Sequence, residues 1–188
     1  MERIELHHYD LLITKSINGL AGQFALLDTF FIYLTSFGVP LMVVAVALQW
    51  WRRASRLEVR HTLVASGLTF LLGLALNQVT LLFIHRMRPY DAGLTHLLLA
   101  PSADFSFPSD HATASFAIAF AFFAHGLRRW GTAFAIAAIL ICFSRVYVGT
   151  HYFTDILGGA ITAAFASLIV KQAYLRDTRI DRFVTGLF

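Results

Sequence analysis

The feature that most constrains this chain is a series of long apolar stretches separated by short polar segments. Hydrophobic residues make up 57% of the sequence and charged residues only 14%, whereas soluble domains carry about 25% charged residues. A helix of about 20 residues, at about 1.5 Å rise per residue, crosses a bilayer core of about 30 Å. We therefore expect an all-α fold, a polytopic membrane helix bundle with about five transmembrane helices. The expected helices cover residues 24–51, 62–84, 109–127, 131–148 and 153–174.

The two ends of the chain are expected to lie outside the bilayer core. Residues 9–20 alternate apolar and polar groups at helical spacing but are too short and too polar to span. They predict an interfacial helix within an N-terminal segment, residues 1–23. Residues 175–188 are mixed in charge and are expected to form a cytoplasmic tail. The whole chain, residues 1–188, is expected to be a single domain.

The distribution of basic residues predicts the orientation of the bundle. The segments 52–60, 128–129 and 171–182 carry ten Lys and Arg residues, against five on the opposite side. The side richer in Lys and Arg is usually cytoplasmic. The net charge of +4 forms no continuous basic stripe, so a nucleic-acid partner is not expected. We expect a multi-pass protein of the inner cell membrane with no obligatory protein partner.

Three polar clusters interrupt the apolar pattern, at residues 85–89, 106–111 and 144–155. The chain crosses the membrane after the second cluster and returns before the third, so both should face the same aqueous surface. The first cluster is separated from the second by only one connecting loop and should share that surface. Because the side rich in Lys and Arg is expected to be cytoplasmic, the surface shared by the three clusters is expected to face the periplasm or the exterior.

The basic and hydroxyl groups of these clusters predict a phosphate site. Arg88 and Arg145 together suit a phosphate, which arginine binds through paired hydrogen bonds, better than a carboxylate. Ser109 follows Pro108 and begins an apolar stretch, so it is expected to cap a helix. The first N–H groups of such a helix attract an anion.

Two further charged residues are counted among the substrate-binding candidates. Asp110 lies in the first helical turn, where the helix dipole favours a carboxylate. Because it would repel a phosphate, its side chain is expected to point away. Arg86 is either a further phosphate contact or an interfacial residue whose charged end reaches the membrane surface.

Two histidines would supply the chemistry. His151 and Asp155 are four residues apart, a spacing that on one helical turn brings the carboxylate to the imidazole. Asp155 would then fix one ring nitrogen and leave the other free as a nucleophile. His111 would act as the general acid on the same phosphate. We expect phosphoryl transfer through a phosphohistidine, with no metal and no cofactor, because the Arg charges can stabilise the transition state.

Two of the clusters carry motifs of a known family. The pattern Ser-Arg-x3-Gly-x-His-x3-Asp is matched in full by Ser144, Arg145, Gly149, His151 and Asp155. Pro-Ser-x-His is matched at residues 108–111. In these motifs the chain resembles the type 2 phosphatidic acid phosphatase superfamily, over most of its length. The resemblance implies a membrane phosphatase with His151 as nucleophile, Asp155 as its orienting partner and His111 as acid. It also places three residues on the phosphate, Arg88, Ser109 and Arg145.

The substrate is less closely specified by these motifs. Phe-Pro-Ser-Asp-His, which contains Asp110, is similar to the bacitracin-resistance type of undecaprenyl diphosphate phosphatase. That similarity implies hydrolysis of undecaprenyl diphosphate in the recycling of the lipid carrier for cell wall biosynthesis. The first family motif is matched only at Arg88 and Pro89, and Leu81 stands where a Lys is usual. Two alternatives remain: a phosphatidate- or phosphatidylglycerophosphate-type phosphatase, and a non-catalytic lipid-phosphate binder or transporter. The expected partners are a polyprenyl or other lipid phosphate and membrane lipids.

Overall fold

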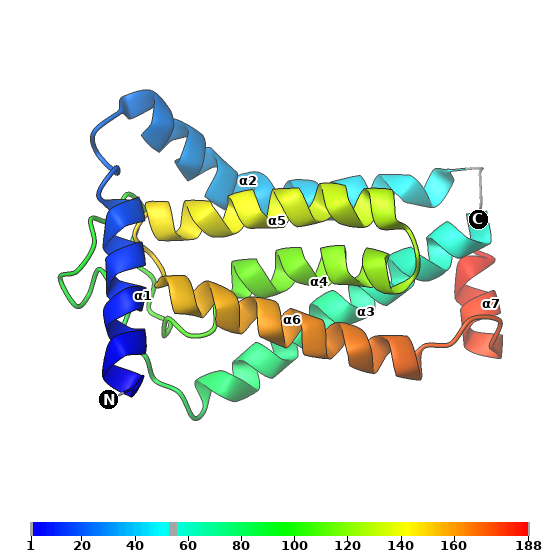
Figure 1. Ribbon diagram of the computed structural model, residues 1–188. Coiled ribbons are helices and arrows are strands. Elements are labelled where there is room, and N and C mark those ends of the chain that lie inside the picture. Colours follow the sequence, from blue (N-terminus) through cyan, green and yellow to red (C-terminus); the bar gives the residue numbers. More distant parts are fainter. Residues whose placement is uncertain (1, 53–55, 188) are drawn as a thin grey trace.

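The fold is a bundle of helices in a computed structural model that describes residues 2–52 and 56–187, with side chains described from residue 7 onward. These ranges contain helices and no strand. The elements are α1 (Glu2–Asn18), α2 (Ala25–Leu48), a short 3-10 helix η1 (Gln49–Trp51), α3 (Arg56–Leu81), α4 (Asp110–Ala124), α5 (Arg128–Tyr147), α6 (Phe153–Ala173) and α7 (Arg179–Thr185). Figure 1 shows α2 to α6 running along the bundle, with α1 across one end and α7 at the other.

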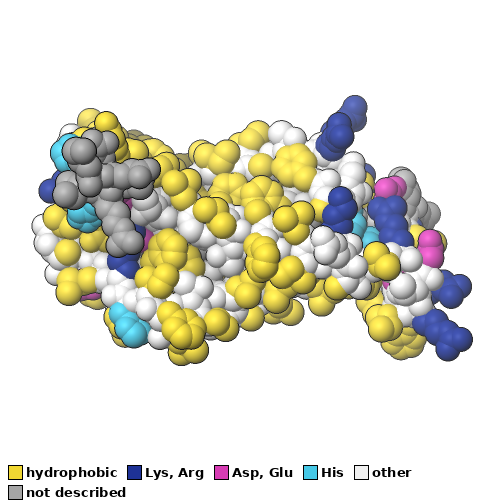
Figure 2. All heavy atoms as spheres, turned by 60° about the horizontal axis from the view of Figure 1, so that its bottom comes forward, with side chains coloured by type: hydrophobic (Ala, Val, Ile, Leu, Met, Phe, Trp, Pro, Cys, Tyr) yellow, Lys and Arg dark blue, Asp and Glu magenta, His cyan; other side chains and the backbone are white. Residues whose placement is uncertain are grey.

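The central helix of the bundle is α4, which packs against α3, α5 and α6. Small side chains make this packing close, because Ala112, Ala117 and Ala119 are fully buried and allow neighbouring backbones to approach. The other helices turn large apolar side chains outward. Leu26 on α2 and Ile161 on α6 are 89% and 70% exposed. Figure 2 shows hydrophobic side chains covering the middle of the molecule, the surface expected to face lipid.

The structure confirms the predicted all-α bundle and corrects the length of one span. The helices α2 with η1, α3, α5 and α6 are long and apolar enough to cross a bilayer. Helix α4 has 15 residues, about 22 Å at ~1.5 Å per residue, which is less than a bilayer core of about 30 Å. It is shorter than the predicted 109–127 because Pro108 and Ser109 precede its start and Gly126, at φ 85°, follows its end.

The start of α4 is fixed against the start of α6. A Cβ atom on Gly159 would lie 2.6 Å from the carbonyl oxygen of Ser109, so a glycine is needed where the two helices meet. The backbone N–H of Ser109 donates to the carbonyl of Asp155 at 3.1 Å. Two of the predicted polar clusters therefore meet through their backbones at the end of the bundle that α1 crosses.

Candidate active site

A cavity of about 200 Å³ opens at this end of the bundle. The structure brings to its wall one or more residues from each of the three predicted polar clusters. The site candidates that line it are Arg88, Asp110, His111, Arg145 and His151. The remaining lining residues are Gln78, Leu81, Ser102, Asp104, Phe105 and Pro108. Side chains that are far apart in the sequence thus share one small polar space.

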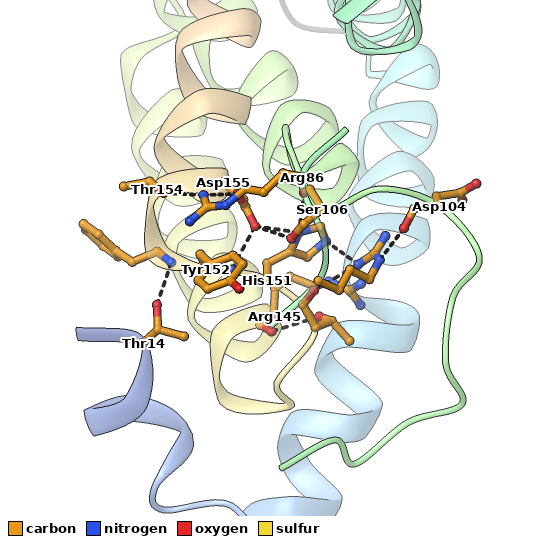
Figure 3. A network of polar contacts seen from close by, with 12 residues as sticks. Thr14, Arg86, Asp104, Ser106, Arg145, His151, Tyr152, Thr154 and Asp155 are labelled. Atoms are coloured by element: carbon orange, nitrogen blue, oxygen red, sulfur yellow. Dashed lines mark hydrogen bonds and ion pairs between the residues drawn. The ribbon is translucent and has the colours of Figure 1, made fainter. Parts of the chain in front are cut away.

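His151 lies in the turn between α5 and α6 and is 3% exposed. Its Nδ1 is 2.9 Å from the carbonyl oxygen of Ser106. Because a carbonyl oxygen can only accept a hydrogen bond, Nδ1 carries the proton and Nε2 carries the lone pair. Nε2 is 3.3 Å from Nη1 of Arg88, so the lone pair is directed toward the cationic part of the site (Figure 3).

The protonation of His151 is set mainly by its burial. Loss of solvation lowers its pKa from 6.5 to about 4, and the positive charges of Arg145 and Arg88 act in the same direction. The neighbouring carboxylate of Asp155 opposes this shift without cancelling it. At neutral pH the imidazole is therefore uncharged, which is the form that can attack an electrophile.

Asp155 lies within reach of His151, but not by the geometry that the sequence predicts. His151 precedes α6, which begins at Phe153, so the pair does not share a helical turn. Oδ2 of Asp155 is 3.5 Å from Nδ1 of His151 and accepts from the N–H of Tyr152 at 2.9 Å. It also accepts from the hydroxyl of Ser106. The carboxylate caps the N-terminus of α6 and thereby holds together the two segments that position the imidazole.

Two arginines approach the cavity from different elements. Nε of Arg88 donates to the carbonyl of Asp104 at 2.8 Å, and its Nη1 donates to the carbonyl of Thr150 at 3.0 Å. Arg145, from α5, donates from Nη1 to Oγ1 of Thr35 on α2 at 2.7 Å. Its Nε is buried without a hydrogen-bond partner, so this guanidinium keeps a donor for an anion.

Ser109 also has unused hydrogen-bonding capacity. It occupies the N-cap position of α4, as predicted, but its side chain makes no capping hydrogen bond. The hydroxyl oxygen is fully buried and has no partner. A buried hydroxyl without a partner is unfavourable by about 1–3 kcal/mol. Ser109 is not itself among the residues that line the cavity, but its neighbours Pro108 and Asp110 are.

His111 and Asp110, in the first turn of α4, are among the residues that line the cavity. Asp110 is thus at the site, although its side chain is expected from the sequence to point away from a phosphate. Oδ1 of Asp110 accepts from Nδ2 of Asn77 on α3 at 2.7 Å. Asn77 also donates to Thr113 at 2.9 Å, so it joins α3 to α4 by two hydrogen bonds.

Arg86 has a different environment from the one predicted. Its guanidinium lies over the ring of Tyr152 at 3.8 Å and donates to Oδ1 of Asp155 and to Oδ2 of Asp10, each at 2.6 Å. It is not among the residues that line the cavity. We therefore assign Arg86 to the support of Asp155 and not to the substrate (Figure 3).

Helix α1 contributes to the site in a way that its pattern does not predict. Asp10 is 3% exposed and accepts from the N–H and the hydroxyl of Thr154 at 2.9 and 2.7 Å. Thr14 accepts from the N–H of Phe153 at 3.0 Å. Both residues thus satisfy first-turn N–H groups of α6. The alternation in residues 9–20 carries a weak signal for this, since it places these polar groups on the face that meets the bundle.

The loop before α4 forms one wall of the cavity through Ser102, Asp104 and Phe105. Asn18 at the end of α1 holds this loop in place, with Nδ2 donating to the carbonyl of His96 and Oδ1 accepting from its N–H, at 2.8 and 2.7 Å. Leu81 also lines the cavity, so the position of the usual family Lys is at the site and is apolar here.

The arrangement is suited to a tetrahedral oxyanion. Arg145 and Ser109 have unpaired buried donors, Arg88 adds a second guanidinium, and His151 presents a lone pair. Arg88, Arg145 and His151 line one small cavity, where desolvated donors stabilise developing negative charge more strongly than donors in water do.

Comparisons with known proteins identify relatives of the chain. The family model described as the PAP2 superfamily matches residues 62–179. Undecaprenyl-diphosphatase BcrC of Bacillus subtilis is 34% identical over 151 residues, which cover 80% of this chain and 77% of the relative. Phosphatidylglycerophosphatase B of the same organism is 31% identical over 163 residues, covering 79% of this chain and 72% of the relative.

A solved structure extends the comparison to the fold. The crystal structure of a transmembrane PAP2 type phosphatidylglycerolphosphate phosphatase from Bacillus subtilis superimposes with a TM-score of 0.65 at 25% identity. The superposition covers 93% of this chain and 89% of that one. The likeness therefore includes the N-terminal helices as well as the motif-bearing helices.

Proposed function

The chain belongs to the PAP2 superfamily and is a membrane lipid phosphatase, and we propose that it removes the terminal phosphate of undecaprenyl diphosphate through a phosphohistidine at His151. The observation that carries the mechanism is the hydrogen bond from Nδ1 of His151 to the Ser106 carbonyl. It leaves Nε2 unprotonated beside Arg88, which is the state that a nucleophile requires.

In the first step, the Nε2 lone pair of His151 forms a bond to the terminal phosphorus. The bond between that phosphorus and the bridging oxygen breaks, and the leaving undecaprenyl phosphate takes the electron pair. His111, which lines the same cavity, would be protonated when the anionic substrate is bound, and it gives this proton to the leaving oxygen. Arg88, Arg145 and Ser109 would hold the equatorial oxygens of the transferred group.

In the second step, water attacks the phosphohistidine and the N–P bond breaks, so that its electron pair returns to Nε2. His111 accepts a proton from the attacking water. Inorganic phosphate leaves, and both histidines return to their starting states.

Undecaprenyl diphosphate is proposed as substrate because a relative with that activity in its name is 34% identical over most of both chains. A phosphatidylglycerophosphate-type substrate is the second candidate, because a relative with that name is 31% identical. We propose that the site faces the periplasm or the exterior of an inner membrane, since the basic residues concentrate at the other end of the bundle.

The test is release of inorganic phosphate by the full chain in detergent, with chelator present. Undecaprenyl diphosphate, phosphatidylglycerol phosphate and phosphatidate are compared at equal mole fraction in the micelles. The proposal expects kcat/KM to be largest for undecaprenyl diphosphate. It also expects protein quenched in alkaline detergent, which preserves the N–P bond, to carry radiolabelled phosphate on His151. A larger kcat/KM for phosphatidylglycerol phosphate would establish the second candidate in its place.

The His151→Ala variant separates catalysis from binding. If it releases phosphate as fast as the unmodified chain, the phosphohistidine route is wrong. If neither protein releases phosphate but both bind the lipid, the chain is the non-catalytic binder that the sequence left open.

A further inference from the structure

The end of the bundle opposite the candidate active site contains a second hollow, of about 570 Å³, at the turn between α4 and α5. Three of its lining residues are arginines, Arg52, Arg128 and Arg129, and Trp130 forms part of its wall. We propose that this hollow binds the anionic headgroup of a phospholipid in the leaflet opposite the one that the active site faces.

The three guanidiniums carry charge that the protein does not neutralise. Within the described residues, none of them forms an ion pair with a carboxylate, and no acidic residue lines the hollow. Arg52 lies over the ring of Trp130 at 5.2 Å, an arrangement that orients a cation without cancelling its charge. Three positive charges around one hollow favour an anionic ligand.

A second feature points to a ligand with an apolar tail. An apolar groove of about 350 Å³ runs between α2 and α5. Trp130 and Ala133 line both the groove and the hollow, so the two adjoin at these residues. Further along, the groove passes Leu41 on α2 and Leu140 on α5, which are 65% and 46% exposed. Its direction follows the helices into the apolar belt of the bundle.

The occupant that fits both parts is a phospholipid. A free phosphate would use the arginines but leave the groove empty, and a hydrocarbon chain would use the groove alone. An anionic lipid places its headgroup among the arginines and one acyl chain along the groove, and basic residues near a membrane surface attract such lipids.

The general excess of basic residues at this end of the bundle does not explain why three arginines surround the hollow. Lys171, Arg179 and Arg182 lie at the same end, where Figure 2 shows most of the visible Lys and Arg side chains, and they do not line the hollow. These residues offer a matched control, because they carry the same charge at the same end of the bundle.

The experiment measures lipid binding to the purified full chain by native mass spectrometry. Palmitoyl-oleoyl phosphatidylglycerol and palmitoyl-oleoyl phosphatidylcholine are titrated separately into detergent-solubilised protein. Neither has a terminal phosphate monoester or diphosphate, so neither supplies the group that the active site would remove. We expect one phosphatidylglycerol to bind at least about tenfold more tightly than phosphatidylcholine.

The triple variant Arg52→Gln, Arg128→Gln and Arg129→Gln should abolish this preference while keeping phosphate release, which shows that it is folded. The control, Lys171→Gln with Arg179→Gln and Arg182→Gln, should keep the preference. Ala133→Trp should weaken phosphatidylglycerol binding by obstructing the junction of groove and hollow.

Four results would overturn the proposal: an unchanged preference in the triple variant, an equal loss in the control, full competition by inorganic phosphate, or equal binding of the two lipids by the unmodified chain. Competition by phosphate would identify a free-anion site, and loss in the control would identify a diffuse charge effect.

Discussion

The two ends of the bundle each contain a buried histidine beside an aspartate, and they use the pair differently. At the active-site end, Nδ1 of His151 donates to a backbone carbonyl, and Asp155 lies further away at 3.5 Å. At the other end, Nδ1 of His61 on α3 is 2.8 Å from Asp181 on α7. His61 is 2% exposed and its ring stacks on Tyr174 at 4.7 Å.

The pair of His61 and Asp181 is part of a structural contact. Asp181 also accepts from the hydroxyl of Tyr174 at 2.6 Å and from the N–H of Asp177 at 2.9 Å. Burial by itself would raise the pKa of Asp181, but the hydrogen bonds from Tyr174 and His61 outweigh it and lower the pKa. This ionised carboxylate fastens α7 to the end of α3.

The difference between the ends is unused hydrogen-bonding capacity. Within the described part of the chain, four buried side-chain atoms have no partner: Gln49 Oε1, Asn77 Oδ1, Ser109 Oγ and Arg145 Nε. Two of these belong to the candidate active site, and none belongs to the contact between α3 and α7. Buried polar groups are normally satisfied, so the unpaired Nε of Arg145, which lines the cavity, and the unpaired hydroxyl of Ser109 beside it indicate a place for a ligand.

The largest expected effect comes from removing the proposed nucleophile. His151→Ala should lower kcat by at least about 10³-fold, as loss of a nucleophile does in other hydrolases. The measurement is phosphate release per mole of folded protein, with folding checked by thermal unfolding in detergent.

His61→Ala is the matched change at the other end. It leaves Asp181 without one of its buried partners, which destabilises the fold by about 1–3 kcal/mol and should lower Tm. Turnover per folded molecule should stay at the level of the unmodified chain. Equal losses of turnover in the two variants would show that the two histidines do not differ in role.

Arg145→Gln should reduce kcat/KM by about 10²-fold, because it removes a charged donor from the site where negative charge develops. The matched change is Arg60→Gln, which removes a buried guanidinium that donates to the carbonyls of Thr185 and Leu187. That variant should lose stability and keep its turnover. Full turnover in Arg145→Gln would refute a role for this arginine on the phosphate.

Ser109→Ala should have a smaller effect, about tenfold on kcat/KM, which corresponds to one hydrogen bond to a charged group. Its stability should not fall, because the hydroxyl has no partner to lose. Ser115→Ala, two turns along the same helix with a hydroxyl that donates to the carbonyl of His111, should keep the normal rate. A loss of stability with no loss of rate in Ser109→Ala would make the residue structural.

The smallest expected change is in the pH profile on the acid side. Because burial lowers the pKa of His151 to about 4, the neutral imidazole persists as pH falls to 5. The contribution of His151 to kcat/KM should therefore change little between pH 7 and 5 and be lost as pH falls through about 4. A fall in kcat/KM that titrates near about 6.5, the ordinary pKa of histidine, and is assigned to His151 would contradict the burial seen here. Comparing the pH profile with that of Ser109→Ala would isolate the contribution of His151.

Much of the site could be predicted from the sequence because the motifs fix residue types at fixed spacings. The positions of His111, Arg145 and His151 around one cavity follow from two helices that cross the membrane and return. Arg86 could not be assigned in this way. Its partner Asp10 lies 76 residues away, and no local pattern indicates which of two nearby arginines meets a carboxylate of α1.

The sequence by itself determined the elements of this protein: apolar length specified membrane helices, and the spacing of polar residues specified which groups lie at their ends. These are local properties, since a helix rises by a fixed amount per residue. Tertiary structure decided how each group is used. The proton on His151 depends on a carbonyl brought from Ser106, and Asp110 at the cavity is hydrogen-bonded to Asn77 of α3, 33 residues away in the sequence. These features depend on distances between segments that are far apart in the sequence. The spacing of side chains along one segment does not determine those distances.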